Sequence, residues 1–114
     1  YNVTSINLRT FHMAQKINLK KMTSSADKAC RLMSVLSNRD RMMLLCEISQ
    51  GEKCVSELEE SLQIHQPTLS QQLTVLRTEG LVNTRREGKL IYYSSVSAIA
   101  QSVMGVLYEH YCSK

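Results

Sequence analysis

The sequence contains no Trp, one Phe and one Pro among its 114 residues. Aromatic and β-branched residues favour strands, so the scarcity of aromatics disfavours an all-β fold. The only dense β-branched and aromatic run lies at residues 82–96, whereas six Met and many other good helix formers are spread along the chain. We therefore predict a mainly α fold with a small β element. The length suits one modest hydrophobic core and is too short for two ordinary domains.

Long apolar segments are also missing. No stretch of about 18 apolar residues is present, as a membrane-spanning helix would require, and the N-terminus has no uninterrupted apolar core of a secretory signal. We therefore expect a cytoplasmic protein that does not contact a membrane.

The four cysteines form no CxxC pair, which excludes the ligand spacing of zinc fingers and zinc ribbons. They are Cys30, Cys46, Cys54 and Cys112. In a reducing cytosol they should be free thiols, unless one pair is a redox device. We expect no metal site and no cofactor.

Negative charge is scarce in the first part of the chain. The net charge is +4 and the isoelectric point is near 9.0, and Asp27 and Asp40 are the only acidic residues of segment 1–41. A second basic group comprises Arg77, Arg85, Arg86 and Lys89. Such patches suit a polyanion such as DNA, although a weakly basic isoelectric point also occurs in proteins that bind none.

Residues 1–22 mix polar and apolar side chains without a firm period, and we interpret them as an N-terminal arm, partly helical in places. The arm is either native or partly derived from cloning, since Met13 would suit a natural start. Residues 23–114 are interpreted as one DNA-binding and dimerisation domain.

Helical spacing of apolar residues predicts a first helix over 23–36 and a second over 39–49. Ser or Thr residues at the start of "TSSADKACRLMSVL" would cap the first helix, and Ser37 or Asn38 would cap the second. Gly51 supplies a stop after the second helix.

A short third helix, "VSELEESL", is predicted over 55–62, with Ser56 and Glu59 forming a capping box. Pro67 fits the first turn of a fourth helix, where its missing N–H is no loss, and this helix runs to Gly80. The side chains expected to point inward from the fourth helix are Leu69, Leu73 and Leu76.

The runs "LVNTRR" and "LIYYSS" flank Glu87-Gly88-Lys89 and predict a β-hairpin, because Gly readily takes the positive φ of a tight turn. A last helix follows. Its apolar residues fall on one helical face: Val96, Ile99, Val103, Val106, Leu107 and Tyr111.

This order of elements describes a winged helix-turn-helix, in which the recognition helix enters the major groove and the hairpin wing lies along the neighbouring backbone. The recognition helix begins with amide and hydroxyl side chains, which can contact bases or phosphates; these are Gln66, Thr68, Ser70, Gln71 and Gln72. Basic residues for phosphate contact are Arg77 near the end of that helix and Arg85, Arg86 and Lys89 on the wing. Solvated polar side chains and a charged strand edge are the alternative interpretations.

The segment "ELEESLQIHQPTLSQQLTVLRTEGLVNTRREGKLIYYS" resembles the ArsR family of bacterial winged-helix repressors, and the resemblance extends over residues 29–112. It implies a homodimer, with the first and last helices at the interface, that binds an inverted-repeat operator in double-stranded DNA and blocks transcription. The apolar face of the last helix requires a partner of some kind. Packing against its own domain is the alternative.

Many ArsR relatives bind metal through cysteines on the third helix or through Asp and His on the last. Here the third helix has no cysteine, and the last offers only Glu109 and His110, which are adjacent and so point to different sides. A metal or metalloid-responsive repressor stays as the alternative, through a mixed His110 and Cys112 site completed by the partner subunit. An enzyme with Cys112 as nucleophile is disfavoured, because no substrate motif is visible.

The contexts "MMLLCEIS" around Cys46 and "YEHYC" around Cys112 resemble the reactive-sulfur-sensing subgroup of the same family. The resemblance implies that inorganic or low-molecular-weight persulfides crosslink Cys46 to Cys112, that DNA affinity falls, and that sulfide-detoxification genes are expressed. No nearby cation in the sequence would activate Cys46. Cys30 and Cys54 are expected to be structural, with an alternative disulfide through either left open.

Overall fold

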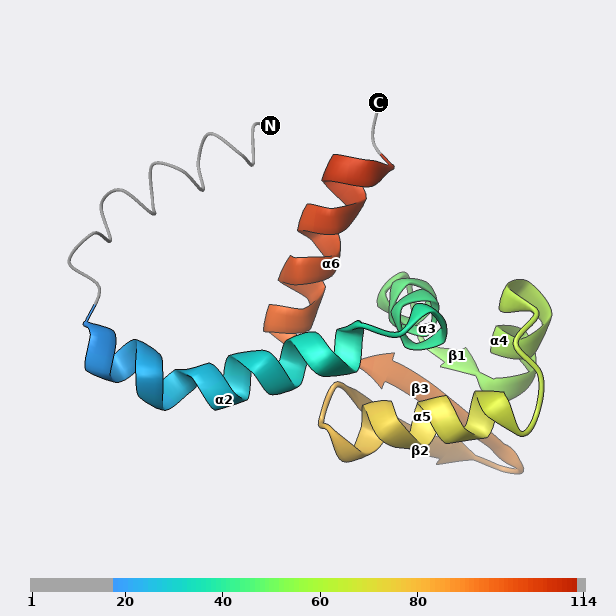
Figure 1. The fold of residues 1–114 in the computed structure, drawn as a ribbon. Coiled ribbons are helices and arrows are strands. Elements are labelled where there is room, and N and C mark those ends of the chain that lie inside the picture. Colours follow the sequence, from blue (N-terminus) through green and yellow to red (C-terminus); the bar gives the residue numbers. More distant parts are fainter. Residues whose placement is uncertain (1–17, 113–114) are drawn as a thin grey trace.

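The structure is a computed structural model that describes residues 18–112. Its elements follow in the order α2 (Leu19–Leu36), α3 (Arg39–Ser49), β1 (Lys53–Cys54), α4 (Val55–Leu62), α5 (Thr68–Thr78), β2 (Val82–Glu87), β3 (Leu90–Ser95) and α6 (Ala98–Tyr111). This arrangement confirms the predicted winged helix-turn-helix, with α4 and α5 as the helix-turn-helix pair and β2–β3 as the wing (Figure 1). None of the helices between residues 18 and 112 has the length and apolar character that a membrane span requires.

The core lies where α3, α4 and α5 meet. Seven side chains of these three helices are at most 2% exposed: Leu44, Leu45, Ile48, Leu58, Leu69, Leu73 and Leu76. The three leucines predicted to point inward from α5 are among them. Burying a leucine fully stabilises the fold by about 1.5–3 kcal/mol relative to leaving it exposed. This stripe therefore fixes which face of α5 is turned to solvent.

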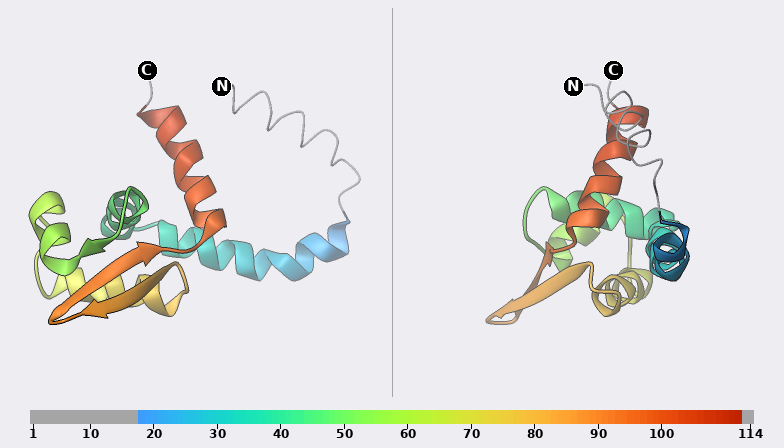
Figure 2. Two further views of the ribbon diagram at one scale, coloured as in Figure 1. Left: turned by 180° about the vertical axis from the view of Figure 1, so that it is seen from behind. Right: turned by 90° about the vertical axis from the view of Figure 1, so that its left-hand side faces the viewer.

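Helix α2 starts at Leu19, earlier than the predicted start at residue 23. The side chain of Asn18 accepts hydrogen bonds from the backbone N–H groups of Lys20 at 2.9 Å and Lys21 at 3.2 Å, so it caps the helix where no Ser or Thr is available. The rest of the predicted arm, residues 1–17, lies outside the described residues. Only Val35 and Leu36 of α2 are buried, and the first half of the helix extends beyond the domain body (Figures 1 and 2).

The capping prediction is confirmed for α3 and wrong for α4. Asn38 accepts a hydrogen bond from the N–H of Arg41 at 3.0 Å, as predicted. In α4, however, the capping position is Cys54, whose backbone N–H donates to Glu57 Oε1 at 2.9 Å. The predicted pair, Ser56 and Glu59, has the same spacing two residues later. Strand β1 explains the difference, because pairing with β3 holds Cys54 in an extended conformation that ends where the helix begins.

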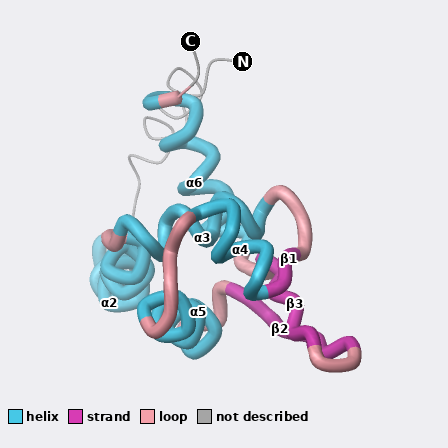
Figure 3. Tube along the Cα trace, turned by 90° about the vertical axis from the view of Figure 1, so that its right-hand side faces the viewer, coloured by secondary structure: helices cyan, strands magenta, loops and turns pink. Residues whose placement is uncertain are grey.

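The sheet has the strand order β1-β3-β2 and is antiparallel throughout. The hairpin is confirmed, with a loop shorter than predicted, because Glu87 pairs with Leu90 and leaves only Gly88 and Lys89 between the strands. Gly88 has a φ of 64°, which a glycine adopts without strain. Strand β1 was not predicted. The wing projects away from the helices (Figure 3).

Helix α6 packs on the domain with a face adjacent to the predicted one. Ala100 and Met104 are buried, whereas Ile99 is 61% and Val106 is 42% exposed. Figures 1 and 2 show that α6 extends away from the domain body toward its C-terminal end. Much of the predicted apolar face of α6 is thus left uncovered by its own domain.

Candidate DNA-binding surface and cysteine cavity

The outward face of α5 carries three of the polar residues predicted to contact DNA. Ser70 and Gln71 are exposed and Thr68 is half-buried. Their orientation follows from the buried leucines on the opposite side of the helix. Thr74 and Thr78 are also exposed on this helix, three and seven positions after Gln71. Neither threonine was among the residues predicted to contact DNA, although helical periodicity counted from Gln71 places both on the same face.

Gln66 has a structural contact at the start of α5. Its Oε1 accepts a hydrogen bond from the backbone N–H of Ser70 at 3.0 Å. Pro67, at the capping position, has no side chain that could bond the free N–H groups there. Gln66 supplies that bond instead, while its amide nitrogen stays available as a donor. Its contact with DNA remains a prediction.

Gln72 lies against Arg41, and its Oε1 accepts a hydrogen bond from the Arg41 guanidinium at 2.7 Å. The same guanidinium donates to the backbone oxygens of Val35 at 2.7 Å and Ser34 at 3.4 Å. Those carbonyls belong to the last turn of α2. Arg41 therefore joins the end of α2, the first turn of α3 and the middle of α5. The predicted DNA contact of Gln72 remains a prediction, with its oxygen already occupied.

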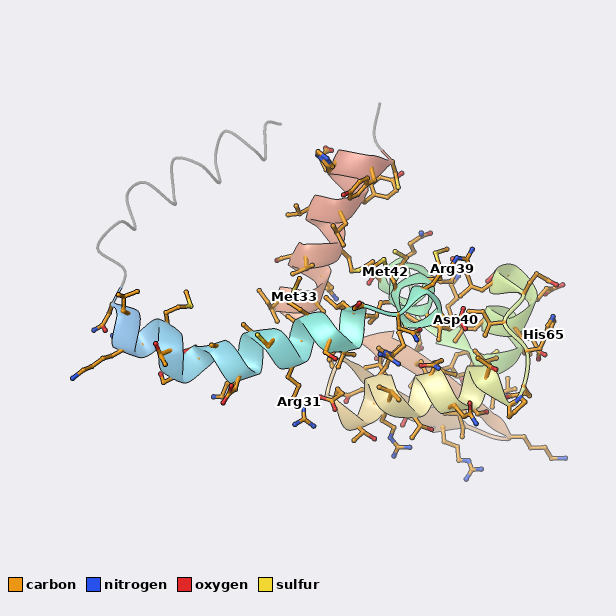
Figure 4. All side chains as sticks on the ribbon, viewed as in Figure 1. Arg31, Met33, Arg39, Asp40, Met42 and His65 are labelled. Carbon is orange, nitrogen blue, oxygen red and sulfur yellow. The ribbon has the colours of Figure 1, made fainter. Side chains whose placement is uncertain are left out.

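A second polar link between α2 and the recognition helix is exposed. Arg31 extends from α2 on the side of α5 (Figure 4) and donates two hydrogen bonds to the Glu79 carboxylate, at 2.7 and 2.9 Å. Glu79 follows directly after α5. Its hydrogen bonds with Arg31 hold the pKa of this carboxyl below its usual range. Because the Arg31 side chain is 71% exposed, solvent screens this pair strongly.

The basic residues of the wing differ in their surroundings. Arg85 forms ion pairs with Glu52 at 2.9 Å and Glu87 at 3.1 Å, and its guanidinium lies 4.7 Å from the centre of the Tyr92 ring. The hydrogen bonds to Glu52 are the largest cause of the raised pKa of Arg85. Arg86 and Lys89 are exposed. Of the four predicted phosphate contacts, Arg85 is the one whose charge is already balanced by carboxylates.

The two predicted sensor cysteines meet at one cavity between α3 and α6. Cys46 is half-buried on α3, Cys112 is exposed at the end of α6, and both are free thiols. They line a cavity of about 360 Å³ together with apolar side chains of both helices. The pKa of Cys46 is raised, first by burial and then by the nearby charges of Cys112 and Glu47. Cys46 is therefore mostly protonated at neutral pH, so the redox reaction predicted for it would depend on its position and not on its acidity.

The other two cysteines lie apart from that cavity. Cys30 is exposed on α2, and Cys54 is buried where β1 meets α4. Neither lines the cavity. Across residues 18–112, no three side chains of His, Cys, Asp or Glu gather closely enough to hold a metal ion.

Comparison with known proteins identifies relatives with the same fold and a related sequence. A family model described as "Bacterial regulatory protein, arsR family" matches residues 38–84. The biofilm growth-associated repressor of Agrobacterium fabrum is 44% identical over 86% of this chain and 84% of its own.

Solved structures agree with this similarity. The crystal structure of the transcriptional repressor BigR from Xylella fastidiosa superimposes with a TM-score of 0.79 at 41% identity, and covers 86% of this chain and all of that one. A homodimeric winged helix-turn-helix DNA-binding domain from Mycobacterium bovis superimposes with a TM-score of 0.67 at 26% identity, over 79% of this chain and 87% of that one.

Proposed function

The chain belongs to the arsR family of bacterial regulatory proteins and is a winged-helix transcriptional repressor, and on that premise we propose that it releases its operator when Cys46 and Cys112 become crosslinked. The observation that supports this proposal is the shared cavity, into which α3 and α6 each bring one of the two thiols. The inducers are persulfides, and the genes released from repression are those of sulfide detoxification.

DNA binding is assigned to α5 and the wing. Ser70 and Gln71 lie on the outward face of α5 and are free to contact base edges, and a glutamine amide matches the donor and acceptor pair of adenine. Arg86 and Lys89 on the exposed wing supply sequence-independent contacts to phosphates. Arg77, exposed near the end of α5, adds a third such contact.

The repressor acts as a homodimer on an inverted repeat. Exposed apolar residues on α6 and α2 offer the surface for a second copy, and they include Ile99, Val106 and Met33. A Mycobacterium bovis relative with this fold is homodimeric. Two recognition helices of such a dimer must lie about 34–36 Å apart to enter successive major grooves. Operator affinity thus depends on the relative placement of the two domains.

A crosslink alters that placement through α3. This helix packs against both α5 and α6. A covalent crosslink between Cys46 and Cys112 would therefore restrain the recognition helix α5 and the proposed dimerisation helix α6 relative to each other. When the crosslink changes the distance between the two recognition helices, neither helix can fully enter the major groove of its operator half-site. A tenfold fall in operator affinity corresponds to a loss of only about 1.4 kcal/mol in binding free energy.

The test treats the reduced protein with inorganic polysulfide and follows peptide mass and operator binding in parallel. We expect a Cys46 to Cys112 crosslink and a fall in operator affinity, both reversed by dithiothreitol. The Cys112→Ser variant should keep full affinity after treatment, and Cys30→Ser, which removes an exposed cysteine outside the cavity, should respond like the unmodified sequence.

Two results would contradict the proposal: no crosslink between these cysteines, or a crosslink that leaves operator affinity unchanged. Zinc or cadmium added to the reduced protein should not alter DNA binding. Stoichiometric metal binding with loss of operator affinity would favour the metal-responsive alternative.

A further inference from the structure

The cavity at the two cysteines has an apolar lining. Besides the thiols, it is formed by three methionines, one leucine and two tyrosines, namely Met42, Met43, Met104, Leu107, Tyr108 and Tyr111. Its volume of about 360 Å³ lies at the lower end of the range for small-molecule sites, which is about 300–1,000 Å³. A group of a few carbons or a single ring fits such a space.

Among residues 18–112, no charged side chain lines the cavity. A carboxylate bound there would lose water without gaining a cation, which is unfavourable. Glu47 adds negative charge beside Cys46, which further disfavours an anion. Methionine side chains, in contrast, adapt to irregular apolar ligands because they are unbranched and polarizable.

We propose that this cavity binds the carrier group of a small organic persulfide, R–S–SH, in which R is apolar and uncharged. The inference rests on the proposed sensor function and narrows the inducer to one chemical class. Charged carriers such as the glutathione tripeptide are disfavoured by the same lining. The selectivity arises from the cavity, because the sulfur chemistry is common to all persulfides.

The reaction order follows from exposure. The Cys112 thiolate, accessible at the end of α6, attacks the outer sulfur of R–S–SH; the S–S bond breaks, and R–S⁻ leaves and takes up a proton. Cys112 then carries a persulfide. The Cys46 thiolate attacks the sulfur bound to the Cys112 side chain, forming a disulfide and expelling HS⁻. Two thiols are oxidised, while the persulfide is reduced to R–SH and hydrogen sulfide.

The shared cavity also accounts for how a thiol with a raised pKa can take part. Cys46 acts in the second, intramolecular step. Its closeness to the Cys112 persulfide compensates there for the small fraction of Cys46 that is ionised. In the first step, a carrier held in the cavity raises the local concentration of persulfide at Cys112. Each carrier methylene removed from water favours binding about fourfold, which corresponds to about 0.8 kcal/mol.

The test compares ethyl, butyl and glutathione persulfides at equal concentration with the reduced full chain. Mass spectrometry gives the initial rate of the Cys46 to Cys112 crosslink, divided by the rate of persulfidation at Cys30 in the same sample. This ratio removes differences in intrinsic reactivity, since Cys30 is exposed and outside the cavity. Butyl persulfide has two methylenes more than ethyl persulfide, so we expect the ratio to rise about 15-fold between them. Glutathione persulfide should give no more than the ethyl value.

A matched pair of variants locates the effect. Met43 lines the cavity and is 38% exposed, whereas Leu90 lies on the wing and is 47% exposed. Met43→Lys should slow the reaction with butyl persulfide and accelerate that with glutathione persulfide, which reverses the preference. Leu90→Lys adds the same charge elsewhere and should keep the original preference.

The outcomes separate the two proposals. Equal ratios for all three persulfides, or a preference that Met43→Lys does not change, would overturn the carrier site and leave the sensor function standing. Failure of every persulfide to crosslink the two cysteines would overturn the sensor function and, with it, the carrier site.

Discussion

Replacing Arg41 by Met should destabilise the domain by about 3–4.5 kcal/mol. Arg41 is half-buried and makes two short hydrogen bonds, both 2.7 Å, to the Val35 carbonyl and to Gln72 Oε1. Hydrogen bonds to charged groups contribute about 1.5–3 kcal/mol each. Because water can replace part of what is lost at a half-buried site, the lower half of the summed range applies. Met keeps most of the side-chain length, so a cavity contributes little to the change.

Urea unfolding of the reduced protein at a fixed concentration measures this change. A domain of this size is stabilised by roughly 5–15 kcal/mol in total, so the midpoint should fall clearly. A double-mutant cycle with Gln72→Ala isolates the bond to the recognition helix, and we expect a coupling energy of about 1.5–2 kcal/mol, the lower half of the range for a hydrogen bond to a charged group. Operator affinity should fall with Arg41→Met as well, because the guanidinium fixes the position of α5 relative to α2.

The control is Arg31→Met, which removes the exposed link between α2 and Glu79. Its side chain is 71% exposed, and we expect no measurable change in stability. A loss below 1 kcal/mol for Arg41→Met, or strictly additive effects of Arg41→Met and Gln72→Ala, would refute the role assigned to Arg41. An equal loss of stability for Arg31→Met would show that the difference in burial between Arg31 and Arg41 does not decide how much each contributes to stability.

Replacing both Glu52 and Glu87 by Gln should raise affinity for random DNA and steepen its salt dependence by up to about one unit, because it releases Arg85 from both ion pairs to contact a phosphate. Unchanged binding would show that Arg85 does not face DNA. Gln71→Ala should weaken operator binding by about 1–3 kcal/mol with little effect on random DNA, and equal losses on both would refute base reading. Arg86→Ala should weaken both DNAs alike and flatten the salt slope. The rate at which persulfidated Cys112 is converted to the crosslink should rise with pH without a plateau below about pH 8.5, the ordinary thiol pKa. Burial raises the pKa of Cys46, the attacking thiol in this step, so its thiolate fraction keeps growing as pH increases. A plateau near pH 7 in the crosslinking assay would contradict that shift.

The elements to which we assign DNA binding were predictable because their signals are local. The predicted bounds of α4, residues 55–62, match the structure, and the leucine spacing of α5 correctly gave its buried face. Helical periodicity depends on neighbours three and four positions apart, which the sequence displays directly. The same local rule failed at the cap of α4, where Cys54-Glu57 and Ser56-Glu59 have equal spacing. Only the pairing of β1 with β3 selects the first pair.

The sequence by itself determined the order of the helices and of the two hairpin strands, the recognition helix with its polar outward face, and the family. Contacts between distant segments decided the rest. The tertiary structure brings Arg41 to Gln72 and Glu52 to Arg85, so two side chains expected to contact DNA already bond to protein. It also places the two cysteines at one apolar cavity, a property of α3 and α6 together. Polarity and spacing specify which face of one helix is apolar, whereas the partner that covers a face or pairs a charge depends on packing across the whole chain.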